Sequence, residues 1–147
     1  MNFISAVTAA GLIAASVTFA HPGPAHAHDA LAVADALESL PLLSDVAPEA
    51  VQISPHVPNM GAHWANPGAG AEGPFYCVIE GRVVCVEYMF PAAELAQGRN
   101  WRGLVPGIAT PPISHFDIEY LPEGIPNRAE PLYQVHAYFA GEALLAD

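Results

Sequence analysis

Two runs of strand-forming residues that flank a single glycine constrain the fold of this chain more than any other feature. Residues 75–79 and 83–90 are rich in aromatic and β-branched side chains, and Gly81 lies between them, a pattern typical of a β-hairpin. Cys77 and Cys85 are equally distant from Gly81, so a loop centred on that glycine would place them opposite each other, where a disulfide can form. A turn shifted by one residue would instead separate them and leave two small buried side chains.

Short helices and further strands accompany the hairpin. Residues 29–40 carry apolar side chains at helical spacing, and residues 91–98 are typical of a brief helix with proline at its start and glycine past its end. Residues 114–120 and 132–139 alternate with the period of two that strands show. The sequence therefore predicts an α+β fold. It is mainly an antiparallel β-sheet, either open or rolled into a barrel, with an N-terminal helix and one short helix.

Prolines divide the chain between these elements. Residues 42–59 contain three prolines, each of which removes a backbone donor, so we expect an extended segment on the surface. Residues 99–112 are predicted to be irregular for the same reason. We expect an N-terminal helix and extended arm over residues 28–54 and a β-rich domain over residues 55–147.

An apolar segment at the N-terminus predicts export. Residues 3–20 are almost wholly apolar and small, and Ala25-His26-Ala27 is typical of a signal-peptidase site. We interpret residues 1–27 as a secretory signal peptide, which makes the mature protein periplasmic or extracellular. A retained membrane anchor is the alternative, because no Lys or Arg precedes the apolar segment, and cleavage after Ala20 is a second possible cut.

The charge of the chain excludes whole classes of partner. Four Lys and Arg residues stand against 15 Asp and Glu residues, for a formal net charge of −11, so little is available to neutralise phosphates. We expect no nucleic-acid partner and no membrane contact after signal cleavage. The sequence also lacks a phosphate-binding Gly-rich loop, a Gly-x-Ser-x-Gly nucleophile motif and a His-Glu-x-x-His metalloprotease motif.

Four side chains are candidate metal ligands: His63, Glu87, His115 and His136. Glu87 interrupts a strand of otherwise buried composition, where an unpaired carboxylate would be costly. A metal ion shared with the histidines would satisfy it, and so would an arginine such as Arg102, or water. Each histidine also has a simpler interpretation, as a turn residue, a surface residue or a hydrogen-bonded core residue.

Two local patterns support these candidates. Gly61 permits an unusual backbone turn that could aim Met60 and His63 at a common point. Strand alternation gives one face of residues 114–120 a histidine and two carboxylates. These are His115, Asp117 and Glu119.

Three short blocks of the sequence carry recognisable motifs. Residues 60–64 form a Met-Gly-x-His motif followed by an aromatic residue, residues 81–89 form an apolar strand that ends in Glu-Tyr-Met, and residues 115–120 read His-Phe-Asp-Ile-Glu-Tyr. In this order they resemble a small uncharacterised family of exported bacterial proteins, whose third motif often ends in a second histidine where this chain has Glu119. A carboxylate is also a competent ligand for zinc or iron. The resemblance covers roughly residues 55–139, implies export and a β-rich domain, and brings no established activity with it.

These observations predict an exported small domain of unknown activity that binds a divalent metal ion or small ligand through a His/Glu cluster, with zinc first and copper or iron next. One alternative is a metal-dependent enzyme with an open coordination position. Another is a structural protein without a metal, in which aromatic residues form the interface of a homo-oligomer. The aromatic residues in question are Trp64, Trp101, Tyr138 and Phe139.

Overall fold

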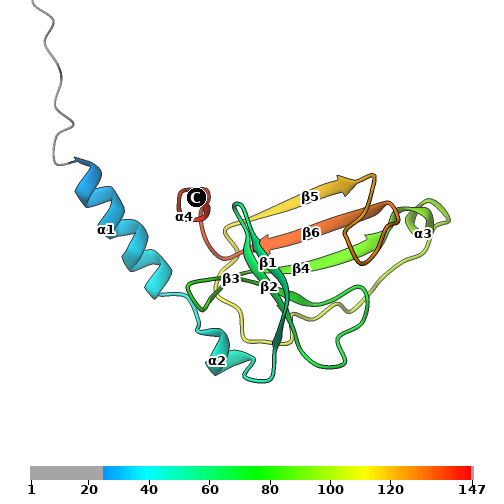
Figure 1. Cartoon of the computed structure of the whole chain (residues 1–147), viewed down its shortest axis with the longest axis horizontal. Coiled ribbons are helices and arrows are strands. Elements are labelled where there is room, and N and C mark those ends of the chain that lie inside the picture. Colours follow the sequence, from blue (N-terminus) through cyan, green and yellow to red (C-terminus); the bar gives the residue numbers. More distant parts are fainter. Residues whose placement is uncertain (1–24, 147) are drawn as a thin grey trace, which may run out of the picture.

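The computed structural model describes residues 25–146, which form a mainly antiparallel six-stranded sheet with four helices (Figure 1). The strands are β1 (Val51–Val57), β2 (Gly61–Ala65), β3 (Phe75–Ile79), β4 (Arg82–Pro91), β5 (His115–Leu121) and β6 (Leu132–Tyr138). The helices are α1 (Ala25–Glu38), α2 (Leu43–Val46), α3 (Ala92–Ala96) and α4 (Glu142–Leu145). The predicted signal peptide lies outside the described residues except for its last three, with which α1 begins.

The sheet is open. Its strand order is β1-β2-β3-β4-β6-β5, and every neighbouring pair is antiparallel. Among the described strands β1 and β5 are the edges, so the barrel alternative is wrong. Alternation within a strand predicts which side chains share a face, but closure depends on pairing between the first and last strands, which alternation does not encode.

The predicted hairpin is present as β3 and β4, with a tighter turn than expected. Glu80 (φ 48°) and Gly81 (φ 78°) both have positive φ, as a two-residue type I′ turn requires. That turn alone would place Val84 opposite Cys77, but a register shift after Cys77 gives β4 one extra residue and brings Cys85 opposite Cys77. The two cysteines form the predicted disulfide, with their Cα atoms 5.0 Å apart.

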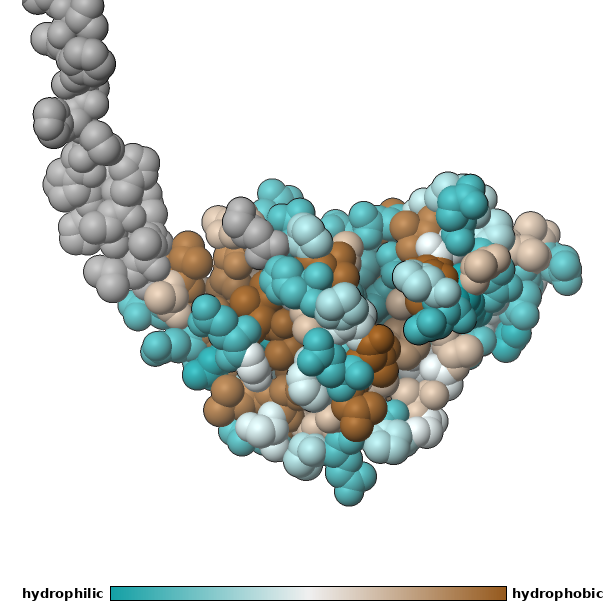
Figure 2. All heavy atoms as spheres, viewed as in Figure 1, coloured by the Kyte–Doolittle hydropathy of each residue, from teal (hydrophilic) through white to brown (hydrophobic). Residues whose placement is uncertain are grey.

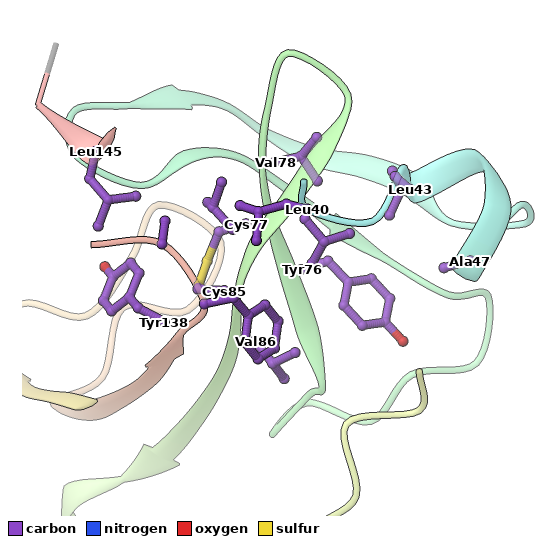
Figure 3. Close-up of a cluster of buried hydrophobic side chains, with 14 residues drawn as sticks. Leu40, Leu43, Ala47, Tyr76, Cys77, Val78, Cys85, Val86, Tyr138 and Leu145 are labelled. Atoms are coloured by element: carbon purple, nitrogen blue, oxygen red, sulfur yellow. A yellow bond between two sulfur atoms is a disulfide. The ribbon is translucent and has the colours of Figure 1, made fainter. Parts of the chain in front are cut away.

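The core is built around β4. Nearly every residue of this strand is buried, because β4 lies inside the sheet between β3 and β6. Figure 3 shows Leu43 of α2 beside Tyr76 at one end of the buried cluster and Leu145 of α4 beside Tyr138 at the other end. A smaller buried cluster lies further along the same strands. It consists of Ala65, Phe75, Met89 and Leu132.

Residues 42–59 differ from the predicted surface linker. They contain α2 and the edge strand β1, which pairs with β2. Pro55 fits in β1 because the ladder is irregular between Gln52 and His56, and an edge strand tolerates a missing donor. The prolines that predicted a linker are therefore compatible with an exposed edge strand.

The segment before β1 is anchored on the hairpin turn. The backbone N–H of Leu43 donates to the carbonyl of Gly81 (2.9 Å), and that of Val83 donates to the carbonyl of Pro41 (2.9 Å). Figure 2 shows hydrophobic residues gathered beside the end of α1 and around α2. Backbone pairing and apolar contact together hold the N-terminal segment against the sheet.

The second predicted helix and the last two predicted strands agree with the structure. The short helix α3 begins directly after Pro91, and β5 and β6 match the alternating segments to within one or two residues. Between α3 and β5 the described chain contains neither helix nor strand, as the prolines in residues 99–112 predicted. No described helix is both long and apolar enough to cross a membrane.

Candidate metal centre

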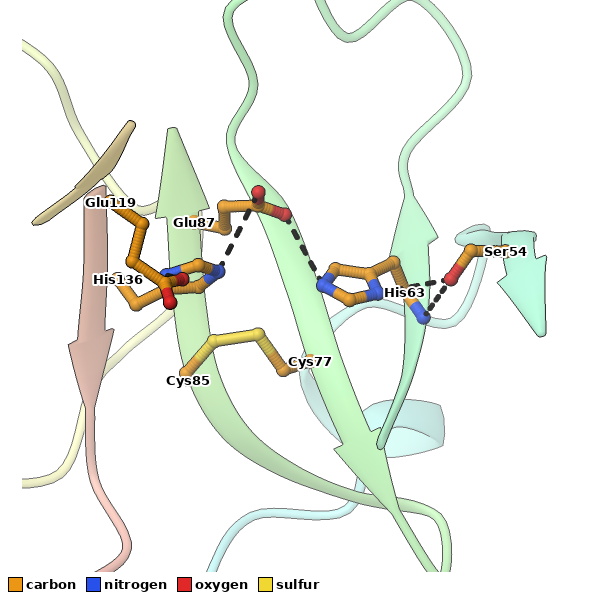
Figure 4. Close-up of a disulfide and its surroundings, with 7 residues drawn as sticks. All are labelled: Ser54, His63, Cys77, Cys85, Glu87, Glu119 and His136. Carbon is orange, nitrogen blue, oxygen red and sulfur yellow. Dashed lines mark hydrogen bonds and ion pairs between the residues drawn. A yellow bond between two sulfur atoms is a disulfide. The ribbon is translucent and has the colours of Figure 1, made fainter. Parts of the chain in front are cut away.

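Three of the four predicted ligands meet on one face of the sheet. The Nε2 atom of His63 lies 3.3 Å from Oε2 of Glu87, and the Nε2 atom of His136 lies 3.5 Å from Oε1 of the same carboxyl group (Figure 4). Glu87 therefore lies between two imidazoles. We call His63, Glu87 and His136 the buried triad.

The strand register explains why these side chains converge. Glu87 is paired with His136 across β4 and β6, while His63 on β2 is paired with Cys77 on β3. The intervening strand places its disulfide beside the two imidazoles (Figure 4). Nitrogen atoms of His63 and His136 and the Sγ of Cys77 all lie within 4.8 Å of one another. The sulfur is not available as a thiolate while it is bonded to Cys85.

Burial disfavours the charged form of all three members of the triad. Glu87 and His136 are 0% exposed and His63 is 7% exposed. Burial, and then the negative charge of Glu119, raise the pKa of Glu87 to about 8. Burial, and then the charge of His63, lower the pKa of His136 to about 4 against an opposing effect of Asp117. Burial also lowers the pKa of His63.

Both imidazoles are held so that Nε2 faces Glu87. The Nδ1 of His63 lies 2.9 Å from the Oγ of Ser54, and this hydroxyl also accepts the backbone N–H of His63 and donates to the carbonyl of Pro55. The contacts assign the proton of His63 to Nδ1, because the hydroxyl proton of Ser54 is already used. The Nδ1 of His136 faces the Oε2 of Glu119 at 3.7 Å. Each Nε2 can therefore present a lone pair to a common point.

Two members of the triad, Glu87 and His136, lack hydrogen bonds to their side chains. Within the described chain, both carboxyl oxygens of Glu87 and both ring nitrogens of His136 have no hydrogen-bond partner, and such a buried group costs about 1–3 kcal/mol. Two ligands of one tetrahedral zinc ion, each at about 2.0–2.1 Å, lie about 3.3–3.4 Å apart. The nitrogen-to-oxygen distances of 3.3 and 3.5 Å are of that size, but they run to different oxygens of Glu87, one on each side of the carboxyl group.

The fourth predicted ligand, His115, is not part of the triad. Its ring stacks on Tyr138, with centroids 4.6 Å apart, and Tyr138 in turn stacks on His136 at 5.5 Å. Both histidines contact the same tyrosine instead of the same carboxylate. Arg102, the other predicted partner of Glu87, is exposed, whereas Glu87 is fully buried.

The turn at Gly61 forms as predicted, but it does not aim Met60 and His63 at one point. Gly61 has φ of 81°, and a Cβ there would lie 2.3 Å from the carbonyl oxygen of Val78. Met60 lines a separate pocket, while His63 joins the triad.

Ser54 holds His63 in place but was not among the residues predicted for the site. The residue lies in the segment predicted as a linker, and a single serine there carries no signal. Glu119 was placed on the correct face of its strand, but its proximity to His136 depends on the pairing of β5 with β6.

No protein-family model matches the chain, and no curated protein matches it. Among solved structures, the chain is similar to the crystal structure of a hypothetical protein from Thermus thermophilus, with 19% sequence identity and a TM-score of 0.54. The similarity covers 65% of this chain and 90% of that protein. At this identity it shows the fold alone, a mainly antiparallel sheet with short helices, and the resemblance to exported bacterial proteins stays a prediction.

Proposed function

We propose that this protein binds one divalent transition-metal ion, zinc first, through His63, Glu87 and His136. The observation that carries the proposal is a fully buried carboxyl group between two imidazoles with no hydrogen bond to satisfy it. Two neutral imidazoles and one carboxylate are a donor set that zinc takes in proteins, and copper and iron come next. A carboxylate and a hydroxyl behind the metal-facing imidazoles are the outer partners typical of such sites.

Binding and proton release are coupled in this proposal. Because the pKa of Glu87 is raised to about 8, its carboxyl group carries a proton at pH 7. A cation bound there displaces that proton, whereas the neutral imidazoles lose none. We therefore expect close to one proton released for each ion bound at neutral pH.

Burial favours metal binding over catalysis. Three protein ligands leave one position open in a tetrahedral site, as a metal-dependent enzyme requires. However, Glu87 and His136 have no exposed surface, so a substrate cannot reach such a position without displacing core side chains. We therefore place metal binding first and metal-dependent catalysis second.

Export belongs to the same proposal. The disulfide between Cys77 and Cys85 is typical of proteins that fold in an oxidising compartment, and the predicted signal peptide over residues 1–27 would deliver the chain there. Intact mass and N-terminal sequencing of the protein from a periplasmic fraction test this part. A chain that keeps residues 1–27 would contradict it.

The test of metal binding is elemental mass spectrometry on the tag-free exported protein. We expect about one ion per chain in the wild type, and loss of that ion in Glu87→Gln and in His63→Ala. His115→Ala is the matched control, because it removes a histidine that lies outside the triad, and it should keep the ion. A wild type that stays metal-free after incubation with zinc and copper would contradict the proposal, as would equal loss in His115→Ala.

Self-association through β5 is a second candidate function. The edge strand β5 exposes Phe116, Ile118 and Tyr120 to 60%, 71% and 52%, and an unpaired edge with an apolar row is a surface that another chain can pair with. The aromatic residues predicted for this role are instead half-buried or buried. These are Trp64, Trp101, Tyr138 and Phe139.

Sedimentation velocity tests this second candidate. If β5 forms an interface, Ile118→Lys should convert an oligomer into a monomer. Ile53→Lys is the control, because Ile53 is exposed on the opposite edge strand β1. A wild-type protein that is monomeric at high concentration would contradict this candidate.

A further inference from the structure

The outer edge of β5 is open to another chain. β5 is the last strand of the described sheet (Figure 1), and β6 is its one partner there. The pairing with β6 is continuous from His115 to Leu121, without a register shift. An edge strand directs about half of its backbone N–H and C=O groups away from the sheet. No other segment of the described chain pairs with these groups of β5.

The opposite edge of the sheet is protected, whereas the edge at β5 is not. β1 contains Pro55 and an irregular register between Gln52 and His56, and both features hinder the addition of a further strand. From His115 to Leu121, β5 contains no proline, no lysine and no bulge. Of the two edges of the described sheet, that of β5 is therefore the regular one.

One face of β5 is apolar. Phe116, Ile118 and Tyr120 project from it, and each is more than half exposed. Each of the three is paired with a half-buried residue of β6, and the rings of Tyr120 and Tyr133 lie 5.1 Å apart. We call these paired residues of β5 and β6 the apolar strip. The apolar side chains of an added strand would pack beside it.

The other face of β5 is acidic. Asp117 and Glu119 lie on this face and line a pocket of about 280 Å³, whose lining in the described chain contains no Lys or Arg. Opposite charges on facing residues of neighbouring strands stabilise a sheet, and like charges destabilise it. This face of β5 therefore favours an added strand with basic side chains.

The same carboxylates disfavour pairing of β5 with β5 of a second copy. When two identical strands pair antiparallel about a twofold axis, each face meets the same face of the other copy. Asp117 and Glu119 would then lie opposite or diagonal to their own copies, which costs free energy. The chain contains no lysine and has a net charge of −11. The charges therefore favour a segment of a different protein over a second copy.

We propose that β5 is a docking site for an extended segment of another protein in which Lys or Arg alternates with apolar residues. Backbone hydrogen bonds to the outer edge of β5 give affinity, and alternate side chains give specificity. The apolar side chains of the segment lie beside the apolar strip, and its basic side chains lie beside Asp117 and Glu119. The inference does not depend on metal binding, and it competes with self-association for the same strand.

The experiment measures binding of fluorescently labelled peptides by anisotropy, with a chelator present. The peptides are as long as β5 and capped at both ends. One alternates Lys with Val, one contains the same residues in two blocks, and one alternates Glu with Val. The test variant is Asp117→Lys. The control variant is Glu49→Lys, which changes the net charge equally at an exposed residue outside β5.

We expect the alternating basic peptide to bind the wild type at least about 10-fold more tightly than the block peptide, because only alternation matches both faces of β5. Asp117→Lys should weaken this binding at least about 10-fold, and Glu49→Lys should change it by less than about twofold. The peptide with Glu should not bind.

A second measurement needs no variant. Amide hydrogen exchange of the wild type, followed by NMR, should show added protection of residues 116–120 with the alternating basic peptide and not with the block peptide. Such protection locates the peptide on the edge of β5, because outward N–H groups become hydrogen-bonded there. Protection confined to other strands would overturn the proposal.

The other outcomes are equally decisive. Equal binding of the two basic peptides, or equal loss in both variants, would overturn the proposal, because net charge would then account for binding. Binding of the peptide with Glu as tight as that of the basic one would also overturn it. A wild-type dimer in which β5 is protected without peptide would identify a second copy as the occupant. Each of these results leaves the proposed metal binding standing.

Discussion

At position 87 a carboxyl group stands where a central strand would ordinarily carry an apolar side chain. Its neighbours on both sides along β4 are buried or half-buried hydrophobic residues, so the composition of the strand alone identifies Glu87 as exceptional. Composition alone does not explain why a carboxyl group is buried there. The partners His63 and His136 come from two other strands, and their positions depend on register across the sheet.

The stability of the metal-free protein should peak at about pH 6.5. The ordinary pKa of Glu87 is 4.5, and its pKa in the fold is about 8. Between pH 4.5 and pH 8, Glu87 therefore keeps a proton in the folded protein that it loses in the unfolded chain, so the free energy of unfolding falls as the pH rises. His136 has its pKa lowered from 6.5 to about 4, so the unfolded chain takes up a proton first as pH falls, and stability falls in that direction. His63, with its pKa also lowered, acts in the same sense.

From these shifts we expect the free energy of unfolding to be about 1 kcal/mol lower at pH 8 than at pH 6.5, because the histidines offset part of the loss from Glu87. Urea unfolding with a chelator present measures it. In Glu87→Gln the loss above pH 6.5 should disappear. An unchanged slope in that variant would show that another group is responsible.

Ser54→Ala should weaken metal binding without abolishing it. The hydroxyl of Ser54 accepts from the backbone and faces the ring of His63, and loss of an outer partner of this kind typically costs about 10–100-fold in affinity. Competition with a zinc chelator measures the change. Ser44→Ala, at an exposed serine in α2, is the control and should bind as the wild type does.

Among the elements, the β3–β4 hairpin carries both the buried carboxyl group of the site and the cysteines of the neighbouring disulfide. It carries Glu87 and the disulfide, and the register shift after Cys77 sets which face each presents. The two strands and the pairing of the cysteines were predicted from the sequence. The register shift after Cys77 was not predicted. A continuous apolar run has the same composition with or without one extra residue, so only the observed strand pairing shows the shift.

Cys77→Ala with Cys85→Ala should lower the free energy of unfolding by about 2–3 kcal/mol, the range expected for a short closed loop. Urea unfolding under non-reducing conditions measures the loss. A reducing agent should destabilise the wild type and leave the double variant unchanged. An effect of the reductant on the variant would mean that it acts elsewhere.

Gly61→Ala should destabilise the protein by more than about 2 kcal/mol. Positive φ disfavours any side chain, and at Gly61 the new Cβ would also overlap the carbonyl oxygen of Val78. Gly68→Ala is a matched control, since Gly68 has a similar φ of 83° but nothing within 4 Å of the added carbon. Equal losses in urea unfolding would contradict the steric argument.

For the whole molecule, local patterns predicted the α+β class and most strands, while two global properties escaped. The choice between open sheet and barrel depends on pairing between distant strands. The second property is which faces of β5 and β6 are buried. In β6 the face with Gln134, His136 and Tyr138 is buried, whereas in β5 the apolar side chains are exposed, the reverse of what hydrophobicity alone would predict. A polar face that is buried indicates a site, and no rule of hydrophobic burial predicts it.

Zinc should stabilise the entire domain, because the triad joins β2, β4 and β6. At a free concentration of about 100 times the dissociation constant we expect about 2.7 kcal/mol of added stability, measured by urea unfolding. Calcium should add little, because it prefers a shell of about six to eight oxygen ligands. Equal effects of zinc and calcium would indicate nonspecific binding to the acidic surface.

The position of the disulfide makes the order of two events matter. The Sγ of Cys77 lies within 4.8 Å of imidazole nitrogens on both sides of Glu87, so the same sulfur can be a bridge or a donor, but not both at once. A chain that meets zinc while its cysteines are still reduced would hold the ion with sulfur, and the ion would then protect Cys77 from oxidation. A chain that is oxidised first keeps only nitrogen and oxygen donors. The order of zinc binding and cysteine oxidation would thus decide which donor atoms hold the ion.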